Sequence, residues 1–135
     1  MLVVDTNIIV PLYVRTATSG TVRELRARDE VWRTDPFALV EFCNVLATYQ
    51  RAQYLSEAAA QESLVQAETF LRPHFFSASH GAALELAMRH RVTAYDGRFL
   101  ALADQLGSRL VTEDAKLRAA APALTQSLDE ALASV

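Results

Sequence analysis

The stretch Leu2-Val-Val-Asp-Thr-Asn-Ile-Ile-Val10 opens the chain and indicates its fold class. Its first residues are apolar and rich in valine, which predicts a buried strand over 2–5. A helical pattern follows over about 7–14. Short apolar runs alternate with helical patterns in the same way along the rest of the chain. This alternation is typical of βαβ units, so we expect an α/β fold around a mainly parallel sheet.

The remaining elements follow from periodicity and from helix start and stop signals. Strands are expected over 31–34, 109–112 and 124–126, the last at an edge of the sheet, with a short strand at 75–77. Helices are expected over 18–28, 36–52, 56–71, 79–91, 95–106, 114–121 and 128–132. No linker, repeat or low-complexity segment divides the 135 residues, which predicts a single domain over 1–135.

Composition narrows the class of protein. Hydrophobic residues make up 51% and charged residues 21%, as in a folded globular protein. No apolar run approaches the ~20 residues that a membrane span needs. The chain passes from Met1 directly into a strand without a basic leader segment. The single cysteine, Cys43, excludes an internal disulfide and is expected in the core of its apolar helix. Together these features predict a cytoplasmic protein.

The chain has a net negative charge, and its basic residues are almost all arginine. The net charge is −3, which counts against a high-affinity, non-specific nucleic-acid binder. Of the 13 basic residues all but Lys116 are arginine, a side chain suited to bidentate contacts with phosphate and carboxylate. A codon bias toward arginine explains the same composition without any function.

Four carboxylates occupy places where function is expected. Asp5 follows the first strand, Asp96 opens the helix over 95–106, and Asp114 follows the strand over 109–112. Glu41 lies within the apolar helix over 36–52. The carboxyl ends of parallel strands form the edge where ligands bind in α/β sheets. Because gathered carboxylates repel one another unless a cation neutralises them, the pattern predicts a divalent-metal site.

Each acid also has a structural interpretation. Asp5, Asp96 and Asp114 are all placed where an aspartate caps a helix N-terminus. Glu41 lies mid-helix, where no cap is needed, and its alternative partner is an arginine in an ion pair. Glu113 adjoins Asp114, and on an extended segment only one of the two side chains can face the site.

Spacing separates Asp104 from the proposed site. It follows Asp96 by eight residues, so on one helix it lies ~12 Å further along and ~80° around, too far to share a metal ion. Other polar residues are expected to support the carboxylates or a water molecule: Asn7, Asn44 and Thr112. Asn44 lies one turn after Glu41 on nearly the same helix face, and Thr112 shares a face with Asp114 on an extended segment. Arg15 and Arg98 lie near the acidic motifs and are expected to contact the substrate.

Several other chemistries lack their signals. The three histidines have no zinc-ligand spacing, and neither a Gly-rich phosphate loop nor a Gly-x-Ser-x-Gly elbow is present. A strand-end aspartate can also be a phosphoacceptor. A dehalogenase-like site needs Asp-x-Asp, but Asn7 stands at the second position. A receiver-type site needs an acid pair near the N-terminus, which is missing although Lys116 is roughly placed.

Taken together, the motifs resemble those of PIN domains: Val3-Val-Asp-Thr-Asn-Ile-Ile-Val10, Glu41 in its helix, Tyr95-Asp-Gly-Arg-Phe-Leu-Ala-Leu-Ala103, and Leu110-Val-Thr-Glu-Asp-Ala-Lys-Leu117. The resemblance covers essentially the whole chain. In length and motif order the chain is most similar to the VapC ribonuclease toxins of type II toxin–antitoxin modules.

This resemblance implies a three-layer, Rossmann-like α/β sandwich with the activity of a Mg²⁺- or Mn²⁺-dependent endoribonuclease. The acidic quartet of the family falls on Asp5, Glu41, Asp96 and Asp114. Asp5, Asp96 and Asp114 would hold metal, with Glu41 ligating it or orienting its water. The resemblance further implies a structured RNA substrate such as tRNA or rRNA, a homodimer and a small antitoxin. The alternative is a degenerate PIN scaffold that binds RNA or a protein without catalysis.

Overall fold

Four short parallel strands form the sheet in the computed structural model, which describes residues 1–135. The strands are β1 (Leu2–Val4), β2 (Trp32–Arg33), β3 (Leu110–Val111) and β4 (Thr125–Gln126), in the spatial order β2-β1-β3-β4. The expected parallel sheet is therefore confirmed, with β4 at an edge. Since β1 and β3 are the two central strands, the segments that follow them emerge side by side at the middle of the sheet.

The helices lie close to their expected ranges. They are α1 (Thr6–Tyr13), α2 (Ser19–Arg28), α3 (Phe37–Arg51), α4 (Glu57–Leu71), the 3₁₀ turn η1 (Arg72–His74), α5 (His80–His90), α6 (Ala94–Gln105), α7 (Ala115–Ala120) and α8 (Leu128–Ser134). The strand expected at 75–77 is only a single bridge between Thr34 and Phe75. None of the helices combines the length and the apolar character needed to cross a membrane.

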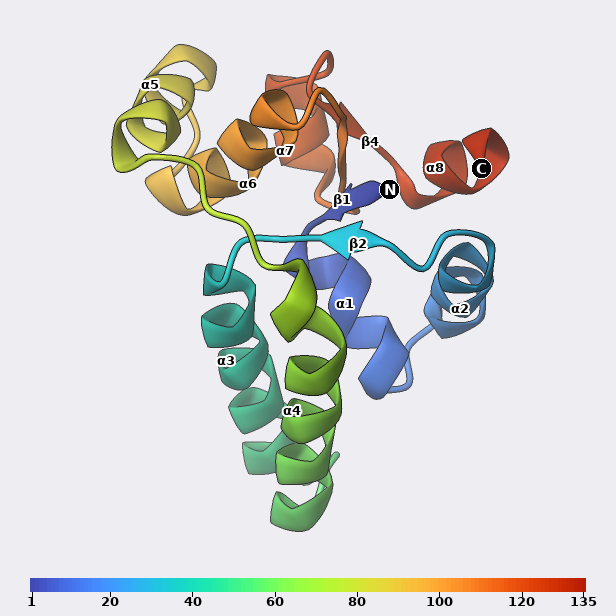
Figure 1. Cartoon of the computed structure of the whole chain (residues 1–135). Coiled ribbons are helices and arrows are strands. Elements are labelled where there is room, and N and C mark those ends of the chain that lie inside the picture. The colour runs from blue at the N-terminus through green and yellow to red at the C-terminus, as the bar shows by residue number, and fades with distance from the viewer.

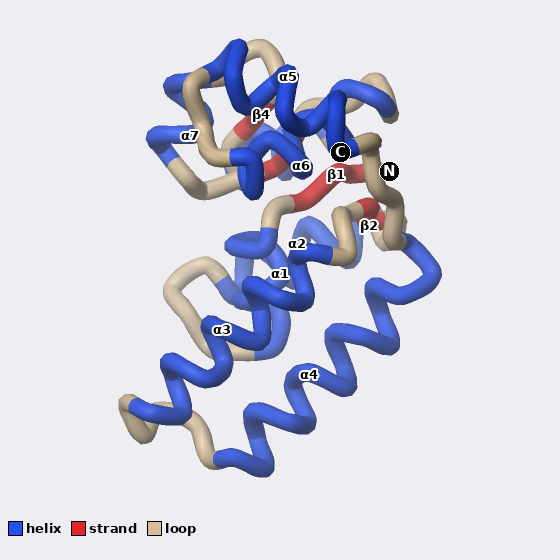
Figure 2. The backbone as a smooth tube through the Cα atoms, turned by 90° about the vertical axis from the view of Figure 1, so that its left-hand side faces the viewer, coloured by secondary structure: helices blue, strands red, loops and turns tan.

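The helices cover both faces of the sheet (Figure 1). Helices α1 to α4 lie on one side and α5 to α7 on the other. Seen from the side, α3 and α4 form an antiparallel pair that extends away from the sheet (Figure 2). Cys43 is exposed and lines a hollow between these two helices, so its expected place in the core is wrong. The apolar run of α3 is longer than the face that the rest of the protein covers, and Val40 is likewise exposed.

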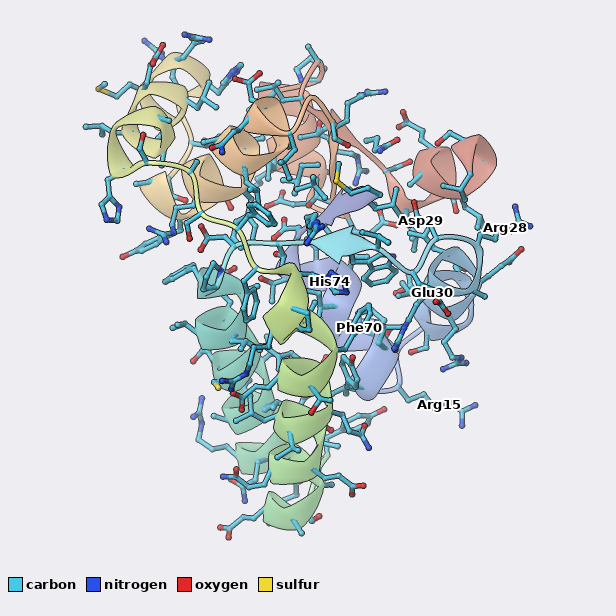
Figure 3. The ribbon with its side chains drawn as sticks, viewed as in Figure 1. Arg15, Arg28, Asp29, Glu30, Phe70 and His74 are labelled. Atoms are coloured by element: carbon cyan, nitrogen blue, oxygen red, sulfur yellow. The ribbon has the colours of Figure 1, made fainter.

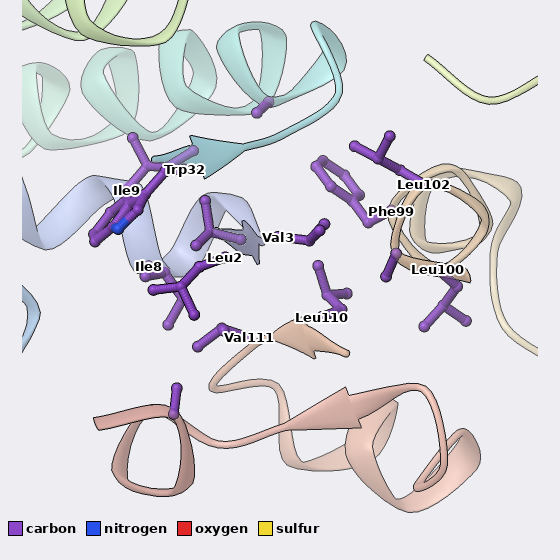
Figure 4. Packing of buried hydrophobic residues seen from close by; sticks show 14 of the residues in the cluster. Leu2, Val3, Ile8, Ile9, Trp32, Phe99, Leu100, Leu102, Leu110 and Val111 are labelled. Atoms are coloured by element: carbon purple, nitrogen blue, oxygen red, sulfur yellow. The ribbon is translucent and has the colours of Figure 1, made fainter. Parts of the chain in front are cut away.

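The core is built around the central strand β1 (Figure 4). All three of its residues are buried, and successive side chains point to opposite faces of the sheet. Ile8 and Ile9 of α1 fill one side, while Phe99 of α6 fills the other. The core therefore fixes α1 and α6 against the same strand, and their N-terminal ends carry Asp5 and Asp96.

Candidate active site

All four predicted acids line one hollow of about 430 Å³ at the carboxyl edge of the sheet. Asp5 is buried and the other three are half-buried. The remaining lining residues are uncharged: Thr6, Asn7, Val10, Pro11, Thr16, Thr18, Val45 and Tyr49. No lysine, arginine or histidine nitrogen lies within 4.0 Å of any of the four carboxylates. We call this hollow the acidic pocket.

Asp5 is held at the centre of this arrangement by hydrogen bonds. Its Oδ1 accepts from the backbone N–H of Thr6 at 2.7 Å, and its Oδ2 accepts from the hydroxyl of Thr112 at 2.7 Å. Burial raises the pKa of Asp5 to about 6, the two hydrogen bonds oppose this rise, and the charges of Glu41 and Asp96 add to it. Asp5 thus both caps α1 and carries an uncompensated buried charge.

Glu41 has a hydroxyl partner in place of an arginine. The Thr6 side chain donates to Glu41 Oε1 at 2.7 Å, and no ion pair is formed, so the arginine alternative does not hold. Burial raises the pKa of Glu41; the Thr6 hydrogen bond lowers it, and the charges of Asp96 and Asp35 raise it further. Because α1 begins directly after Asp5, one residue, Thr6, contacts both carboxylates.

The face of α3 that lines the acidic pocket needs a correction. Val45 and Tyr49 follow Glu41 at spacings of four residues and line the pocket with it. Asn44, expected to position Glu41, is exposed and does not line the pocket. Asn44, three positions after Glu41, lies to one side of the row formed by Glu41, Val45 and Tyr49, and faces solvent.

Asp96 and Asp114 approach the pocket from the N-terminal ends of α6 and α7. The actual cap of α6 is Thr93, whose hydroxyl accepts from the Asp96 N–H at 3.1 Å, so the Asp96 carboxylate is not needed as a cap. Burial raises the pKa of Asp96, and the charge of Asp114 raises it further. Asp114 does cap α7, because its Oδ1 accepts from the backbone of Lys116 and Leu117 at 3.0 and 3.1 Å.

Gly97 allows α6 to bring Asp96 into position. A Cβ atom at this residue would lie 2.4 Å from the Ala83 carbonyl oxygen of α5, closer than any side chain permits. The glycine directly after Asp96 is therefore required by the packing of α5 against α6. The packing of α5 against α6 thus explains why the Tyr95–Ala103 motif has a glycine at position 97.

Asn7 and Thr112 tie the loops of the two central strands together. The Asn7 amide donates to the Thr112 hydroxyl at 3.2 Å, and its Oδ1 accepts from the Glu113 N–H at 3.1 Å. Thr112 in turn accepts from the Asp114 N–H at 3.1 Å. The Glu113 carboxylate pairs with Arg118 at 3.2 Å and does not line the pocket, so Asp114 is the acid that faces it.

Arg98 lies outside the acidic pocket and has a partner that the sequence did not reveal. Its Nε and Nη2 donate to Oδ1 of Asp35 at 3.2 and 3.1 Å, and Asp35 is 1% exposed. The only sequence signal at Asp35 was that of a helix start before Pro36. Arg15 is exposed and lines an adjacent hollow instead of the acidic pocket.

The donors of the acidic pocket suit a hard divalent cation. They are carboxylate, hydroxyl and amide oxygens, which Mg²⁺ and Mn²⁺ prefer, and the pocket wall supplies no positive charge. In their present positions, no three His, Cys, Asp or Glu side chains are close enough together to enclose an ion. An ion here would accordingly keep several water ligands, which is the usual state of Mg²⁺ in proteins.

Known proteins share the sequence pattern and the fold of this chain. The model of the PIN domain family matches residues 2–122. The chain is 32% identical over 126 residues to Ribonuclease VapC3 of Pyrobaculum aerophilum, covering 91% of this chain and 96% of that protein. The crystal structure of PAE2754 from Pyrobaculum aerophilum aligns with a TM-score of 0.78 at 19% identity, covering 98% of this chain and 94% of that one. FitAcB from Neisseria gonorrhoeae aligns with a TM-score of 0.66 at 19% identity, covering 94% and 96%.

Proposed function

The chain belongs to the PIN-domain family and is a VapC-type ribonuclease, and we propose that it hydrolyses RNA phosphodiester bonds with Mg²⁺ or Mn²⁺ in the acidic pocket. The observation that carries this proposal is the convergence of Asp5, Glu41, Asp96 and Asp114 on one hollow without a neutralising cation. The degenerate-scaffold alternative is not favoured, because it expects a missing acid and all four line the pocket.

The roles of the side chains follow from their contacts. Asp5, Asp96 and Asp114 would hold the metal, which when bound activates water and neutralises charge that develops on the phosphoryl group. Glu41 has Oε1 fixed by Thr6, which leaves Oε2 to accept a hydrogen bond from the attacking water. The Thr112 hydroxyl hydrogen-bonds both to the Asp5 carboxylate and to the Asp114 backbone N–H, so it positions the two carboxylates relative to each other before the substrate binds.

The direct test is cleavage of single-stranded or loop RNA by the purified chain. We expect cutting with Mg²⁺ or Mn²⁺, none with EDTA, and products with 5′-phosphate and 3′-hydroxyl ends. These ends distinguish attack by water from attack by the ribose 2′-hydroxyl. A cyclic phosphate product would contradict the mechanism, since none of the pocket residues would then need to deliver a water.

We propose further that the protein is the toxin of a toxin–antitoxin pair and acts in the cytoplasm as a homodimer on tRNA or rRNA. Support comes from the similarity to Ribonuclease VapC3. A pocket with four acids and no cation suits an inhibitor that inserts an arginine or lysine in place of the metal.

Co-expression with the neighbouring small gene should relieve growth arrest and yield a copurifying complex. Substitution of the basic residue in that partner should weaken inhibition, and the weakening should be largest at low salt, where charge pairing is strongest. If the chain is harmless to its host and no partner copurifies with it, the toxin proposal fails, and the protein is a nuclease that acts without an antitoxin.

A further inference from the structure

Two further hollows continue from the acidic pocket along the C-terminal end of α1. The second hollow, of about 390 Å³, is lined by Arg15 and Arg23 and shares Pro11 with the acidic pocket. The third hollow, of about 400 Å³, is lined by Arg26 of α2 and by α4, and it shares Tyr13 with the second. Each hollow shares one lining residue with the next, so the three follow one another along α1 from a negative end to a positive end.

The arginines on this path are not neutralised by the protein itself. No carboxylate oxygen lies within 4.0 Å of Arg15, Arg23 or Arg26. Arg28 on the same helix is different, because it pairs with Glu24 at 2.6 Å. Three guanidinium groups without a carboxylate partner, each beside a hollow, provide positive charge for an anionic ligand.

The last arginine of the path is held in place. The Arg26 guanidinium lies 3.8 Å from the centre of the Phe70 ring, and Phe70 is itself packed edge-on against Trp32 at 5.8 Å. Stacking fixes the plane of the guanidinium, and no carboxylate occupies its edge N–H groups. Tyr13 lines both hollows; burial of its hydroxyl raises the pKa of this side chain, and the neighbouring Arg26 guanidinium lowers it.

We infer that one flank of the RNA strand leaves the acidic pocket along this path, with successive phosphates contacting Arg15, Arg23 and Arg26. In Figure 3, Arg15 extends below α2 and Phe70, the platform of Arg26, lies on α4. The inference rests on the proposed ribonuclease function and names where its substrate binds. RNA fits better than an acidic peptide, because the second hollow adjoins, through Pro11, the acidic pocket that would receive the scissile phosphate. A pocket of four acids also repels RNA unless cations beside it compensate.

The test compares a short RNA that spans the cut with the same RNA extended by about six nucleotides on the 5′ or the 3′ side. For the wild type we expect one of the two extensions to raise kcat/KM. The triple variant Arg15→Gln/Arg23→Gln/Arg26→Gln should lose roughly 10- to 100-fold in kcat/KM on that extended RNA and stay within about twofold on the short one. The slope of log kcat/KM against log salt should fall by about 2, since each lost contact to a single strand contributes ~0.7.

Two controls keep the result interpretable. Arg28→Gln removes a paired arginine from the same helix and should leave both RNAs unaffected. Because Arg26 packs against Phe70, the double variant Arg15→Gln/Arg23→Gln, which changes only exposed side chains, should still lose roughly 5- to 20-fold on the extended RNA.

The inference is overturned if no extension helps the wild type, if the triple variant loses as much on the short RNA, or if Arg28→Gln has the same effect. It is also overturned if the triple variant cleaves extended RNA normally but escapes an acidic protein inhibitor, which would assign the path to that partner. If the short RNA is not cut at all, the proposed function itself fails and the path falls with it.

Discussion

Asp5 and Asp35 follow neighbouring strands of the same sheet and differ in the charges that face their carboxylates. Asp5 comes after β1 and Asp35 shortly after β2, and their exposed fractions are 7% and 1%. Each accepts a hydrogen bond of 2.7 Å from a backbone N–H at the start of the next helix, that of Thr6 or that of Phe37. Asp35 has Arg98 as a partner at 3.1 Å, whereas Asp5 faces other carboxylates.

This comparison shows what distinguishes a structural buried carboxylate from one that is available for chemistry. Local structure is the same in both cases: a strand, an acid and a helix N-terminus. The difference arises from α6, which directs Arg98 toward Asp35 and Asp96 toward the acidic pocket. One aspartate is compensated within the fold, and the other is left to be compensated by a ligand.

The largest expected effect is on catalysis when Asp5 is replaced. Asp5→Asn should lower kcat/KM by roughly 10²- to 10³-fold, because removing a carboxylate would weaken the proposed metal site. Glu41→Gln, Asp96→Asn and Asp114→Asn should fall in the same range. The proteins should remain folded by circular dichroism, since each change relieves repulsion within the acidic pocket.

Asp35→Asn serves as the matched control for this prediction. It makes the same chemical change at the end of the adjacent strand but outside the acidic pocket. Activity per folded molecule should stay within a fewfold of wild type. Equal loss of activity in Asp5→Asn and Asp35→Asn would contradict the division of the two aspartates.

The second effect is on stability, through the partner of Asp35. Arg98→Gln leaves the Asp35 carboxylate buried without its cation, and breaking such a pair from one side should cost about 3 to 4 kcal/mol in the free energy of unfolding. Urea denaturation measures this loss. If instead stability is unchanged and KM for RNA rises, Arg98 contacts the substrate, as expected from the sequence.

The sequence predicted the four acids of the pocket better than it predicted their surroundings. Strand ends and helix starts are local, so Asp5, Asp96 and Asp114 were identified from pattern alone, and the parallel sheet then determined that they meet. Asn44 was misplaced because helical spacing does not say on which side of Glu41 the pocket lies. The partnership of Arg98 and Asp35 joins residues 63 positions apart, and no local pattern encodes it.

The third effect is a pH dependence of stability that arises from Asp5 and its acidic neighbours. The pKa of Asp5 is about 6 in the folded protein and 3.8 as the ordinary value, so between these pH values the folded state binds more protons than the unfolded state. Stability of the metal-free protein should therefore fall as pH rises from about 4 to about 6. The loss is on the order of 3 kcal/mol, taken as about two pKa units at ~1.4 kcal/mol each.

Urea denaturation in EDTA across this pH range measures the slope. Burial raises the pKa of Glu41 and Asp96 as well, which adds to the slope in the same direction. Asp5→Asn should flatten it, and Asp35→Asn should retain most of it. Saturating Mg²⁺ should reverse it, because the metal binds the ionised carboxylates. A slope unaffected by Asp5→Asn would place the responsible group elsewhere.

The smallest effect is expected at Asp104, which shares α6 with Asp96 and Arg98 but faces neither the acidic pocket nor Asp35. It is exposed and lines a separate hollow with Glu85 and Arg89 of α5. Asp104→Asn should leave kcat/KM within about twofold and the free energy of unfolding within ~0.5 kcal/mol. Any small change in stability should be a gain, because a negative charge near the C-terminal end of a helix opposes the helix dipole.

Asp104→Asn and Asp96→Asn make the same chemical change on the same helix. A difference in their effects on activity therefore results from the position of the aspartate and not from the residue type. A loss of activity at Asp104 comparable to that of Asp96→Asn would mean that α6 is rotated relative to the sheet, and the contrast between Asp5 and Asp35 would lose its structural cause.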